Sequence, residues 1–430
     1  MRKSYALRWG IVVLLVVGCA TTGSPPASPG STPVTTLSAG SGGTNRPDQL
    51  DKPYVILMSF DGFRGDYLDH YNAPNFQRVA RQGVRAVGLI PSFPSKTFPN
   101  HYTIVTGDYP ATHGIVANRF YDPARNATYA IGDNKAVLDG SWYRGEPIWV
   151  TAEKQGMVTA SYFWVGSEAA IEGIRPTRVK AFPDSTTDNQ RADSALAWLA
   201  LPASQRPHLV AVYMSDVDNA GHRYGPDDSH VQDAITKVDA ALGRILDGIA
   251  TLPFRDRVNL ILVSDHGMAS FTPETAVNIA TLIDTVGVRF ADGGPNANLH
   301  VSGGAARARI LRDSLNRRLQ HGRAYLLEEV PARLHYRADP RIGDIVVVME
   351  EHYQILTRLP QAAGGTHGWD PQYPSMHGIF LAMGPGIRAG SVIPPFENVQ
   401  IYPLLTEILG LKQAPGIDGQ AGWLRSQVMQ

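Results

Sequence analysis

The chain has 430 residues, of which 43% are hydrophobic and only 18% are charged, and this composition excludes a disordered protein. Its 39 lysines and arginines are balanced by 39 aspartates and glutamates, and no run of the sequence is rich in basic residues. Polymeric DNA or RNA is therefore not expected as a partner, because the positive field that attracts nucleic acid is missing.

The N-terminus has the features of an export signal. Three basic residues lie within Met1–Arg8, and the apolar segment Ile11–Val17 is too short to span a bilayer. The segment ends in a pattern that resembles the bacterial lipoprotein processing box, in which Cys19 would become the lipidated first residue. We therefore expect residues 1–19 to be a signal peptide with such a box. A lipid anchor on Cys19 would hold the protein at the periplasmic face of the cell envelope or at the cell surface; an ordinary signal peptide with an incidental cysteine is the alternative.

Residues 20–52 are dominated by threonine, glycine, serine and proline. Such a segment cannot bury enough apolar surface to offset the entropy lost on ordering, so we expect a flexible linker. A globular domain over residues 53–419 and a C-terminal tail over residues 420–430 would follow it.

Apolar runs of strand length recur along the domain. They cover Tyr54–Phe60, Val84–Ile90, Val158–Trp164, Leu209–Met214, Val258–Val263 and Ile379–Met383, and the helical stretches between them include Asn75–Arg81, His230–Ile249 and Val399–Leu409. This alternation predicts an α/β fold whose mostly parallel central sheet has helices on both faces. The rhythm breaks between about 282 and 359, where the strand-like Arg323–Val330 and Ile345–Met349 lie close together, so we expect a small inserted α+β subdomain there.

Residues of the types that bind metals follow three of these strands. Asp61 closes the first strand, Asp218 and His222 follow Leu209–Met214, and the pair Asp265-His266 follows Val258–Val263. Ligands bind beyond the carboxyl ends of strands in open α/β sheets, so these side chains would meet at one edge.

Each residue also has a simpler interpretation. A lone aspartate at a strand end, such as Asp61, is usually a turn former or a helix cap. The adjacent Asp265 and His266 are less easily explained that way, because polar groups at a buried sheet edge need a partner. With His367 in the glycine-rich loop 364–368, the set offers nitrogen and oxygen ligands for two sites, which suits zinc or a similar ion better than calcium.

The segment Ser95–His101 offers a nucleophile. Pro99 is placed near the start of a predicted helix, which puts Thr97 at the helix N-terminus, where an anion is stabilised. On local sequence alone a helix cap is the better interpretation of Thr97. Coordination to a metal would instead raise its alkoxide fraction enough for nucleophilic attack.

Six motifs in series resemble the nucleotide pyrophosphatase/phosphodiesterase family of the alkaline phosphatase superfamily. They are Asp61–Arg64, Lys96–Tyr102, His113–Asn118, Gly145–Trp149, Gly221–Pro226 and Ser264–Met268. The resemblance runs from about residue 53 to residue 419 and implies an alkaline phosphatase-like fold and a phosphodiesterase catalytic domain.

The resemblance implies two zinc ions per chain. One would be held by Asp218, His222 and His367, and the other by Asp61, Asp265 and His266 together with the oxygen of Thr97. Two Zn²⁺ ions carry four positive charges, which three carboxylates and one alkoxide cancel, so an anionic diester could enter without severe repulsion.

The same resemblance implies a catalytic sequence with two in-line displacements. Thr97 would attack phosphorus to form a phosphothreonine diester, and water would then attack from the opposite side, so the configuration is retained overall. Asn118, otherwise a turn residue, would donate its amide to a non-bridging phosphate oxygen as charge builds in the transition state.

The substrate would be a small nucleotide whose base lies between Phe98 and Phe182, because stacking on both faces accepts any base. Trp164 and Glu168 resemble the neighbouring pocket wall, although the family often has proline at position 165 and aspartate at position 168. Ordinary packing is the alternative for both phenylalanines. In the last loop, His367-Gly368-Trp369-Asp370-Pro371 replaces the usual His-Gly-Tyr-Asp-Asn, and the nearby His377 could be mistaken for the ligand.

Three other functions fit parts of this pattern. A choline-phosphate or phospholipid phosphodiesterase would use Trp164 and Glu168 as a cage for a quaternary ammonium. A phosphomonoesterase would need more cations around the phosphate than Lys96, the only one in the nucleophile loop. A metal-binding surface lipoprotein without enzymatic activity would not need Thr97.

Overall fold

The computed structural model describes residues 43–182, 185–420 and 422–430. The predicted signal peptide, the predicted lipid attachment at Cys19 and most of the predicted linker lie outside these residues. Among the described residues, no helix is both long enough and apolar enough to span a bilayer.

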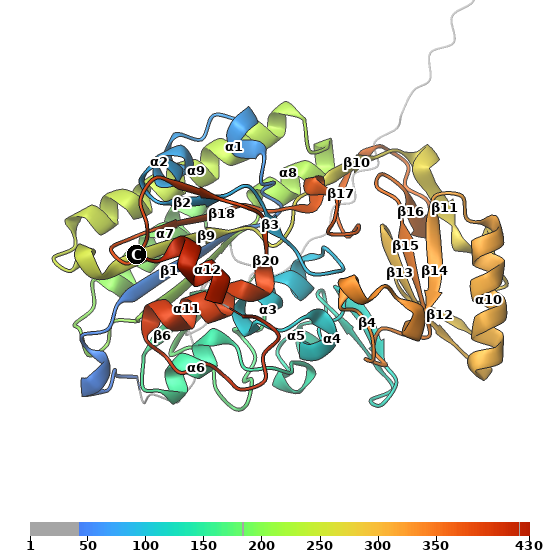
Figure 1. Ribbon diagram of the computed structural model, residues 1–430, viewed down its shortest axis with the longest axis horizontal. Coiled ribbons are helices and arrows are strands. Elements are labelled where there is room, and N and C mark those ends of the chain that lie inside the picture. Colours follow the sequence, from blue (N-terminus) through green and yellow to red (C-terminus); the bar gives the residue numbers. More distant parts are fainter. Residues whose placement is uncertain (1–42, 183–184, 421) are drawn as a thin grey trace, which may run out of the picture. The chain divides into compact units, whose positions relative to one another are not determined.

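The largest sheet of the described residues has eight strands (Figure 1). Its order is β19 (Ser391–Ile393), β2 (Val84–Ala86), β18 (Phe380–Met383), β9 (Val258–Val263), β1 (Tyr54–Phe60), β8 (Leu209–Met214), β6 (Thr159–Tyr162) and β7 (Arg178–Lys180). Only β18 runs against its neighbours, β9 and β2; all other pairs are parallel. The predicted mostly parallel sheet is confirmed.

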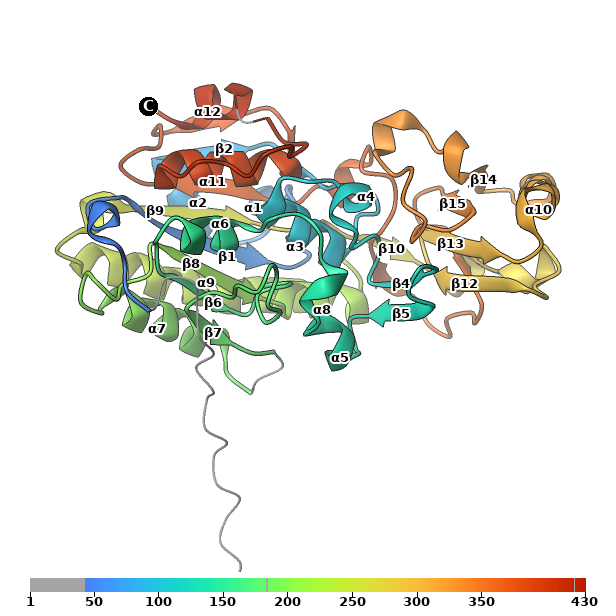
Figure 2. The same ribbon diagram turned by 90° about the horizontal axis from the view of Figure 1, so that it is seen from below.

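Both faces of the sheet are covered, because every side chain of β1 is buried. Val55 and Leu57 point into one apolar cluster, and Tyr54, Ile56 and Met58 into the other. The helices are α1 (Tyr67–His70), α2 (Pro74–Gln82), α3 (Thr97–Thr106), α4 (Pro110–His113), α5 (Asn134–Val137), α6 (Ile148–Lys154), α7 (Asp188–Leu199), α8 (Asp216–Tyr224), α9 (Ser229–Thr251), α10 (Gly304–Arg318), α11 (Ile401–Leu409) and α12 (Gly422–Val428). Helices α3, α6 and α11 cover the first face, and α2, α7 and α9 the second, as Figure 2 shows for α11 and α7.

A second sheet, with an apolar cluster of its own, lies within the range where we expected an insertion. It has four antiparallel strands in the order β12 (Val288–Asp292), β13 (Asn296–Val301), β15 (Ile345–Met349) and β14 (Gly322–Leu326). Helix α10 packs against β13 and β14. Short paired strands complete the fold: β3 (Leu89–Ile90) with β20 (Phe396–Glu397), β4 (Arg119–Asp122) with β5 (Ala127–Ala130), β10 (Ala269–Phe271) with β17 (Gly364–Thr366), and β11 (Ala276–Asn278) with β16 (Gln354–Leu356).

The described part of the expected linker and the expected C-terminal tail both contain buried side chains. Asn45, expected in the linker, is buried, and its side chain donates to the carbonyls of Ala203 and Arg206. The expected C-terminal tail forms helix α12, whose Leu424 and Val428 are buried in the main apolar cluster. Burial of a few side chains by tertiary contacts therefore outweighs local composition at both ends.

Candidate active site

The metal-binding residue types meet at the carboxyl ends of three adjacent strands. Asp61 follows β1, helix α8 brings Asp218 and His222 in directly after β8, and Asp265 and His266 follow β9. Strands β8 and β9 are the two parallel neighbours of β1, so their ends lie side by side. His367 directly follows β17, which pairs with β10 of the loop after β9 and so brings the distant His367 to the same place.

One group consists of Asp218, His222 and His367. Their potential ligand atoms lie within 4.8 Å of one another. The Nε2 atoms of the two histidines are 3.2 Å apart, and Asp218 Oδ1 lies 3.4 Å from His222 Nε2 and 3.8 Å from His367 Nε2. Three nitrogen and oxygen donors that converge on one point are a set that can hold a divalent metal ion.

The second group is formed by Asp61, Asp265 and His266. His266 Nε2 lies 2.9 Å from Asp265 Oδ2 and 3.5 Å from Asp61 Oδ1, and all three residues are buried. Asp61 and His266 also group with Asp218, so the two sets of donors are contiguous. This contiguity is the arrangement that two neighbouring metal ions require.

The histidine ring nitrogens that point away from the site are hydrogen-bonded to the protein backbone. The Nδ1 atoms of His222, His266 and His367 donate to the carbonyls of Gly365, Gly267 and Ser95 at 2.8–2.9 Å. Each ring therefore directs Nε2 to the site, which is the usual arrangement for metal-binding histidines. For His266, the neighbouring Asp265 carboxylate raises the pKa to about 9, so a metal ion at Nε2 would replace a proton. Among the described residues, Asp61 Oδ1, Asp218 Oδ1 and Asp265 Oδ2 are buried without a hydrogen-bond partner. Buried carboxylate oxygens need such a partner or a cation, so these residues fit a metal site.

The pKa values of the candidate ligands also indicate a metal site. Burial, with the Asp265 and Asp218 carboxylates nearby, raises the pKa of Asp61 well above its usual range. Burial likewise raises the pKa of Asp218 to about 7. The pKa of His367 is well below its usual range because of burial and of the neighbouring His266 and His222. A divalent cation would remove the cost of ionising these carboxylates while leaving the imidazoles neutral.

Thr97 is the first residue of helix α3, and it does not cap the helix. Lys96 occupies the cap position, and its own side chain makes no capping hydrogen bond. The hydroxyl of Thr97 instead lies 3.2 Å from His266 Nε2, at the second group. Asn100 fixes the preceding loop, because its amide donates to the carbonyls of Pro94 and Lys96. The local interpretation of Thr97 as a cap is therefore wrong, and its hydroxyl faces the candidate metal site.

Asn118 lies beside Thr97. Its Oδ1 accepts a hydrogen bond from the backbone N–H of Phe98 at 2.9 Å. Because a backbone N–H can only donate, this contact fixes the orientation of the amide and leaves the Nδ2 donor on the cavity side. The geometry suits the predicted role as a donor to a phosphate oxygen.

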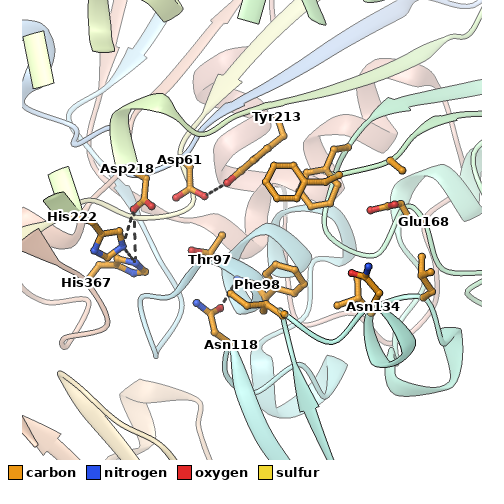
Figure 3. A pocket seen from close by; sticks show the side chains of 17 residues that line it. Asp61, Thr97, Phe98, Asn118, Asn134, Glu168, Tyr213, Asp218, His222 and His367 are labelled. Atoms are coloured by element: carbon orange, nitrogen blue, oxygen red, sulfur yellow. Dashed lines mark hydrogen bonds and ion pairs between the residues drawn. The ribbon is translucent and has the colours of Figure 1, made fainter. Parts of the chain in front are cut away.

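A cavity of about 710 Å³ extends from the candidate metal ligands. Figure 3 shows Asp218, His222 and His367 at one side of it, Glu168 and Asn134 at the other, and Thr97, Phe98 and Asn118 between them. Phe98 is nearly buried and Phe182 is 41% exposed, and both line this cavity. Its remaining walls include Ile131, Val137, Leu138, Phe163 and Tyr213. A flat aromatic group would therefore find mostly apolar walls beyond the nucleophile.

Trp164 does not form the pocket wall that we expected. It is fully buried and is not among the residues that line the cavity; its indole N–H donates to the carbonyl of His101 at 3.0 Å. Phe163 takes the wall position instead. Its backbone has a φ of 47°, in the left-handed region, directly after the end of β6.

Sequence reasoning missed two residues of the site. The Tyr213 hydroxyl donates to Asp61 Oδ2 at 2.6 Å. His101 Nδ1 lies 3.0 Å from the carbonyl of Thr97 and 3.3 Å from Asp265 Oδ2, while its Nε2 contacts the hydroxyl of Ser59 at 2.8 Å. The spacing of four residues between Thr97 and His101 on one helix was the available signal for the second.

Lys96 and His377 lie near the motifs in sequence, but their side chains do not contribute to the candidate metal site. Lys96 Nζ forms a 2.5 Å ion pair with Asp292 of β12, so the one cation of the nucleophile loop is already neutralised. His377 contacts the carbonyl of Pro371 and lines a different hollow, together with Arg64 and Arg85. His367, and not His377, lies among the candidate ligands.

The chain matches known proteins over most of its length. A family model described as type I phosphodiesterase/nucleotide pyrophosphatase matches residues 55–370. Human ectonucleotide pyrophosphatase/phosphodiesterase family member 1 is 34% identical over 385 residues, which cover 86% of this chain and 41% of the human protein. The venom phosphodiesterase CdcPDE of Crotalus durissus collilineatus is 35% identical over 398 residues, which cover 90% of this chain and 48% of that protein. The chain thus spans less than half the length of these curated relatives.

A solved structure shows the same fold. Murine ectonucleotide pyrophosphatase/phosphodiesterase 5, as an inactive threonine-to-alanine variant in complex with AMP, has a TM-score of 0.82 and 29% sequence identity. The match covers 88% of this chain and 100% of the murine chain.

Proposed function

Because this chain belongs to the type I phosphodiesterase/nucleotide pyrophosphatase family, we propose that it hydrolyses phosphodiester or phosphoanhydride bonds of nucleotides and releases nucleoside 5′-monophosphates. One observation carries the proposal above all. The Thr97 hydroxyl lies at a helix N-terminus between two contiguous groups of metal-binding side chains and a largely apolar cavity.

The proposed cofactor is a pair of zinc ions. Asp218, His222 and His367 would hold one ion, and Asp61, Asp265 and His266 the other, with Thr97 beside the second. Such ions would lower the pKa of the threonine hydroxyl and stabilise negative charge on the leaving oxygen.

The residues of the chain would then act in two steps. Thr97 Oγ attacks phosphorus and displaces the leaving group, which forms a phosphothreonine diester that carries the nucleoside. Water displaces Thr97 in the second step, and the two inversions give overall retention. In both steps Asn118 Nδ2 donates to a non-bridging oxygen, and the positive end of α3 favours the anion. A relative supports the threonine, since the threonine-to-alanine variant of the murine protein is described as inactive.

The proposed substrate class follows from the cavity. Phe98 and Phe182 would stack on a nucleobase, and the murine relative is described in complex with AMP. A choline-phosphate or phospholipid substrate is the alternative, because the Glu168 carboxylate stands in the same cavity as the rings of Phe163 and Tyr213 and could hold a quaternary ammonium. A monoesterase is disfavoured, because Asp292 already neutralises Lys96.

A comparison of three chromogenic substrates tests this proposal. The purified protein would be assayed on a nucleotide p-nitrophenyl diester, p-nitrophenyl phosphate and p-nitrophenyl phosphorylcholine, each with and without added zinc. We expect the nucleotide diester to be turned over fastest, and only with metal. Faster turnover of the monoester would exclude the diesterase, and faster turnover of the choline ester would favour the alternative.

We also propose, from the sequence alone, that the protein is exported and anchored by a lipid on Cys19. Expression with a radiolabelled fatty acid tests this. The label should enter the wild-type protein and not the Cys19→Ala variant; equal labelling of both would exclude the anchor.

A further inference from the structure

Tyr213 contacts both the candidate metal site and the substrate cavity. It is the second-last residue of β8, paired with Ser59 of β1, so its side chain stands next to Asp61 at the strand ends. Its hydroxyl donates to Asp61 Oδ2 at 2.6 Å, while its ring lines the cavity. A phenol keeps its proton at neutral pH, so the hydroxyl is the donor and the carboxylate the acceptor.

Because of this hydrogen bond, the two carboxylate oxygens of Asp61 have different surroundings. Oδ2 is occupied by Tyr213, whereas Oδ1 is buried without a hydrogen-bond partner among the described residues and lies 3.5 Å from His266 Nε2. The hydrogen bond therefore favours metal binding through Oδ1, and the carboxylate cannot rotate without losing a short, charge-assisted hydrogen bond. Asp265 shows the same division, because its Oδ1 accepts from the Gly62 N–H at 3.3 Å and its Oδ2 faces the site.

The Tyr213 ring is itself held in one orientation. The rings of Phe163 and His101 pack edge-on against it, each with its centroid 5.2 Å away. The Phe182 ring, on the cavity wall, lies 6.2 Å away. A substrate ring in the cavity would therefore contact Tyr213, the side chain that orients Asp61.

We propose that Tyr213 is a positioning residue, which fixes Asp61 for one-oxygen metal binding and links the substrate wall to the metal site. This inference rests on the proposed metal site, and it goes beyond it by assigning a residue outside the ligand set. Partners that orient metal ligands typically contribute about 10- to 100-fold to metal affinity or activity.

Two conservative variants test the role. Tyr213→Phe keeps the ring and removes only the hydroxyl. Tyr402→Phe is the matched control, because Tyr402 is also buried, contacts the Thr151 hydroxyl at 2.8 Å and the Ala414 N–H at 2.9 Å, and does not line the cavity. Metal-free preparations of both variants and of the wild type would be titrated with Zn²⁺ against a chromogenic chelator, and kcat and KM would then be measured on the nucleotide diester.

We expect Tyr213→Phe to bind one zinc ion about 10- to 100-fold more weakly and to lose kcat, with KM within about twofold of wild type because the ring remains. Tyr402→Phe should bind zinc as the wild type does. Unchanged zinc affinity in Tyr213→Phe, an equal loss in Tyr402→Phe, or a wild type that binds no zinc would each overturn the inference. The titration needs no substrate, so a wild type that binds zinc but hydrolyses no nucleotide would refute the proposed function and still decide the role of Tyr213.

Discussion

The Nε2 atoms of His222 and His367 lie 3.2 Å apart, although both rings use Nδ1 to donate to backbone carbonyls. Two neutral imidazoles in this arrangement bring their lone pairs together. Protonation of either ring is opposed by desolvation, which lowers the pKa of the buried His367 and of the partly exposed His222. A cation bound by both nitrogens would remove the repulsion between the two lone pairs. Metal binding should therefore affect the stability of the fold as well as activity.

Metal removal should inactivate and destabilise the protein. Chelation removes the cations that would compensate the buried Asp61 and the partly buried Asp218, whose pKa values are raised, so we expect loss of activity together with a lower melting temperature. A ligand present at 100 times its Kd stabilises by about 2.7 kcal/mol, which sets the scale for each ion. Differential scanning fluorimetry before and after dialysis against a chelator measures this, and added Zn²⁺ should restore both properties. An unchanged melting temperature would contradict the assignment.

The Thr97→Ala substitution should abolish activity without unfolding the protein. Since the hydroxyl does not cap α3, the free energy of unfolding should change by only about 0.5 kcal/mol. Loss of a covalent nucleophile should lower kcat by about 1,000-fold or more. Thr103→Ala is a useful control, because Thr103 lies on the same helix with its hydroxyl on His113, away from the site. Undiminished turnover by Thr97→Ala would exclude the nucleophile.

Substitutions of Asn118 should separate its two hydrogen-bonding roles. Asn118→Asp keeps the oxygen that accepts from Phe98 N–H, but it replaces the donor with a negative charge. We expect kcat to fall by about 100- to 1,000-fold in Asn118→Ala, as for other transition-state donors, and further in Asn118→Asp. Steady-state kinetics with the nucleotide diester checks the order, and an Asp variant more active than the Ala variant would contradict the donor role.

The strands could be predicted wherever burial alone fixes them. Strands β1, β8 and β9 have the predicted bounds. Every side chain in them is buried, so the apolar run in the sequence has the same ends as the strand in the structure. The predicted strand Val84–Ile90 is instead split into β2 and β3. The break lies at Gly88, where a Cβ atom would come within 2.8 Å of the His377 ring, and such a distant contact leaves no local pattern.

The site residues that belong to sequence motifs could be predicted. Those whose position depends on local backbone conformation could not. The six candidate ligands come together because strand ends position them. Trp164 and Phe163 are neighbours, and Phe163, which has a positive φ, lines the cavity, whereas Trp164 does not; the sequence does not reveal this local backbone conformation. Tyr213 looked like one more apolar strand residue, since nothing in its sequence neighbours reveals the hydrogen bond to Asp61.

The Phe182→Ala substitution should raise KM for nucleotide substrates. Phe182 is 41% exposed, so its truncation leaves no buried void, in contrast to Phe98. Stacking contributes about 1–3 kcal/mol per base, which corresponds to a KM increase of roughly 5- to 150-fold. Methyl p-nitrophenyl phosphate lacks a base and serves as the control substrate, for which KM should change little. Equal effects on both substrates would show that Phe182 does not contact the base.

Asp108 should make stability depend on pH away from the active site. Burial, with Asp418 nearby, raises the pKa of Asp108 from 3.8 to about 6. A raised folded-state pKa means that the protonated form is favoured on folding, so this contribution is present below pH 3.8 and is lost as pH rises to about 6. Above that pH, the folded protein carries a buried carboxylate whose Oδ1 accepts a long, 3.3 Å hydrogen bond from the Asp418 N–H.

We therefore expect Asp108→Asn to stabilise the protein at pH 7.5 and to have little effect at pH 4. The pKa difference corresponds to about 1–3 kcal/mol at neutral pH. Urea unfolding at both pH values measures the difference between variant and wild type. Asp256→Asn, at a side chain that is 86% exposed, removes the same charge from the surface and should change stability at neither pH. A stabilisation by Asp108→Asn of the same size at pH 4 and pH 7.5 would show that packing, and not the carboxylate charge, is responsible.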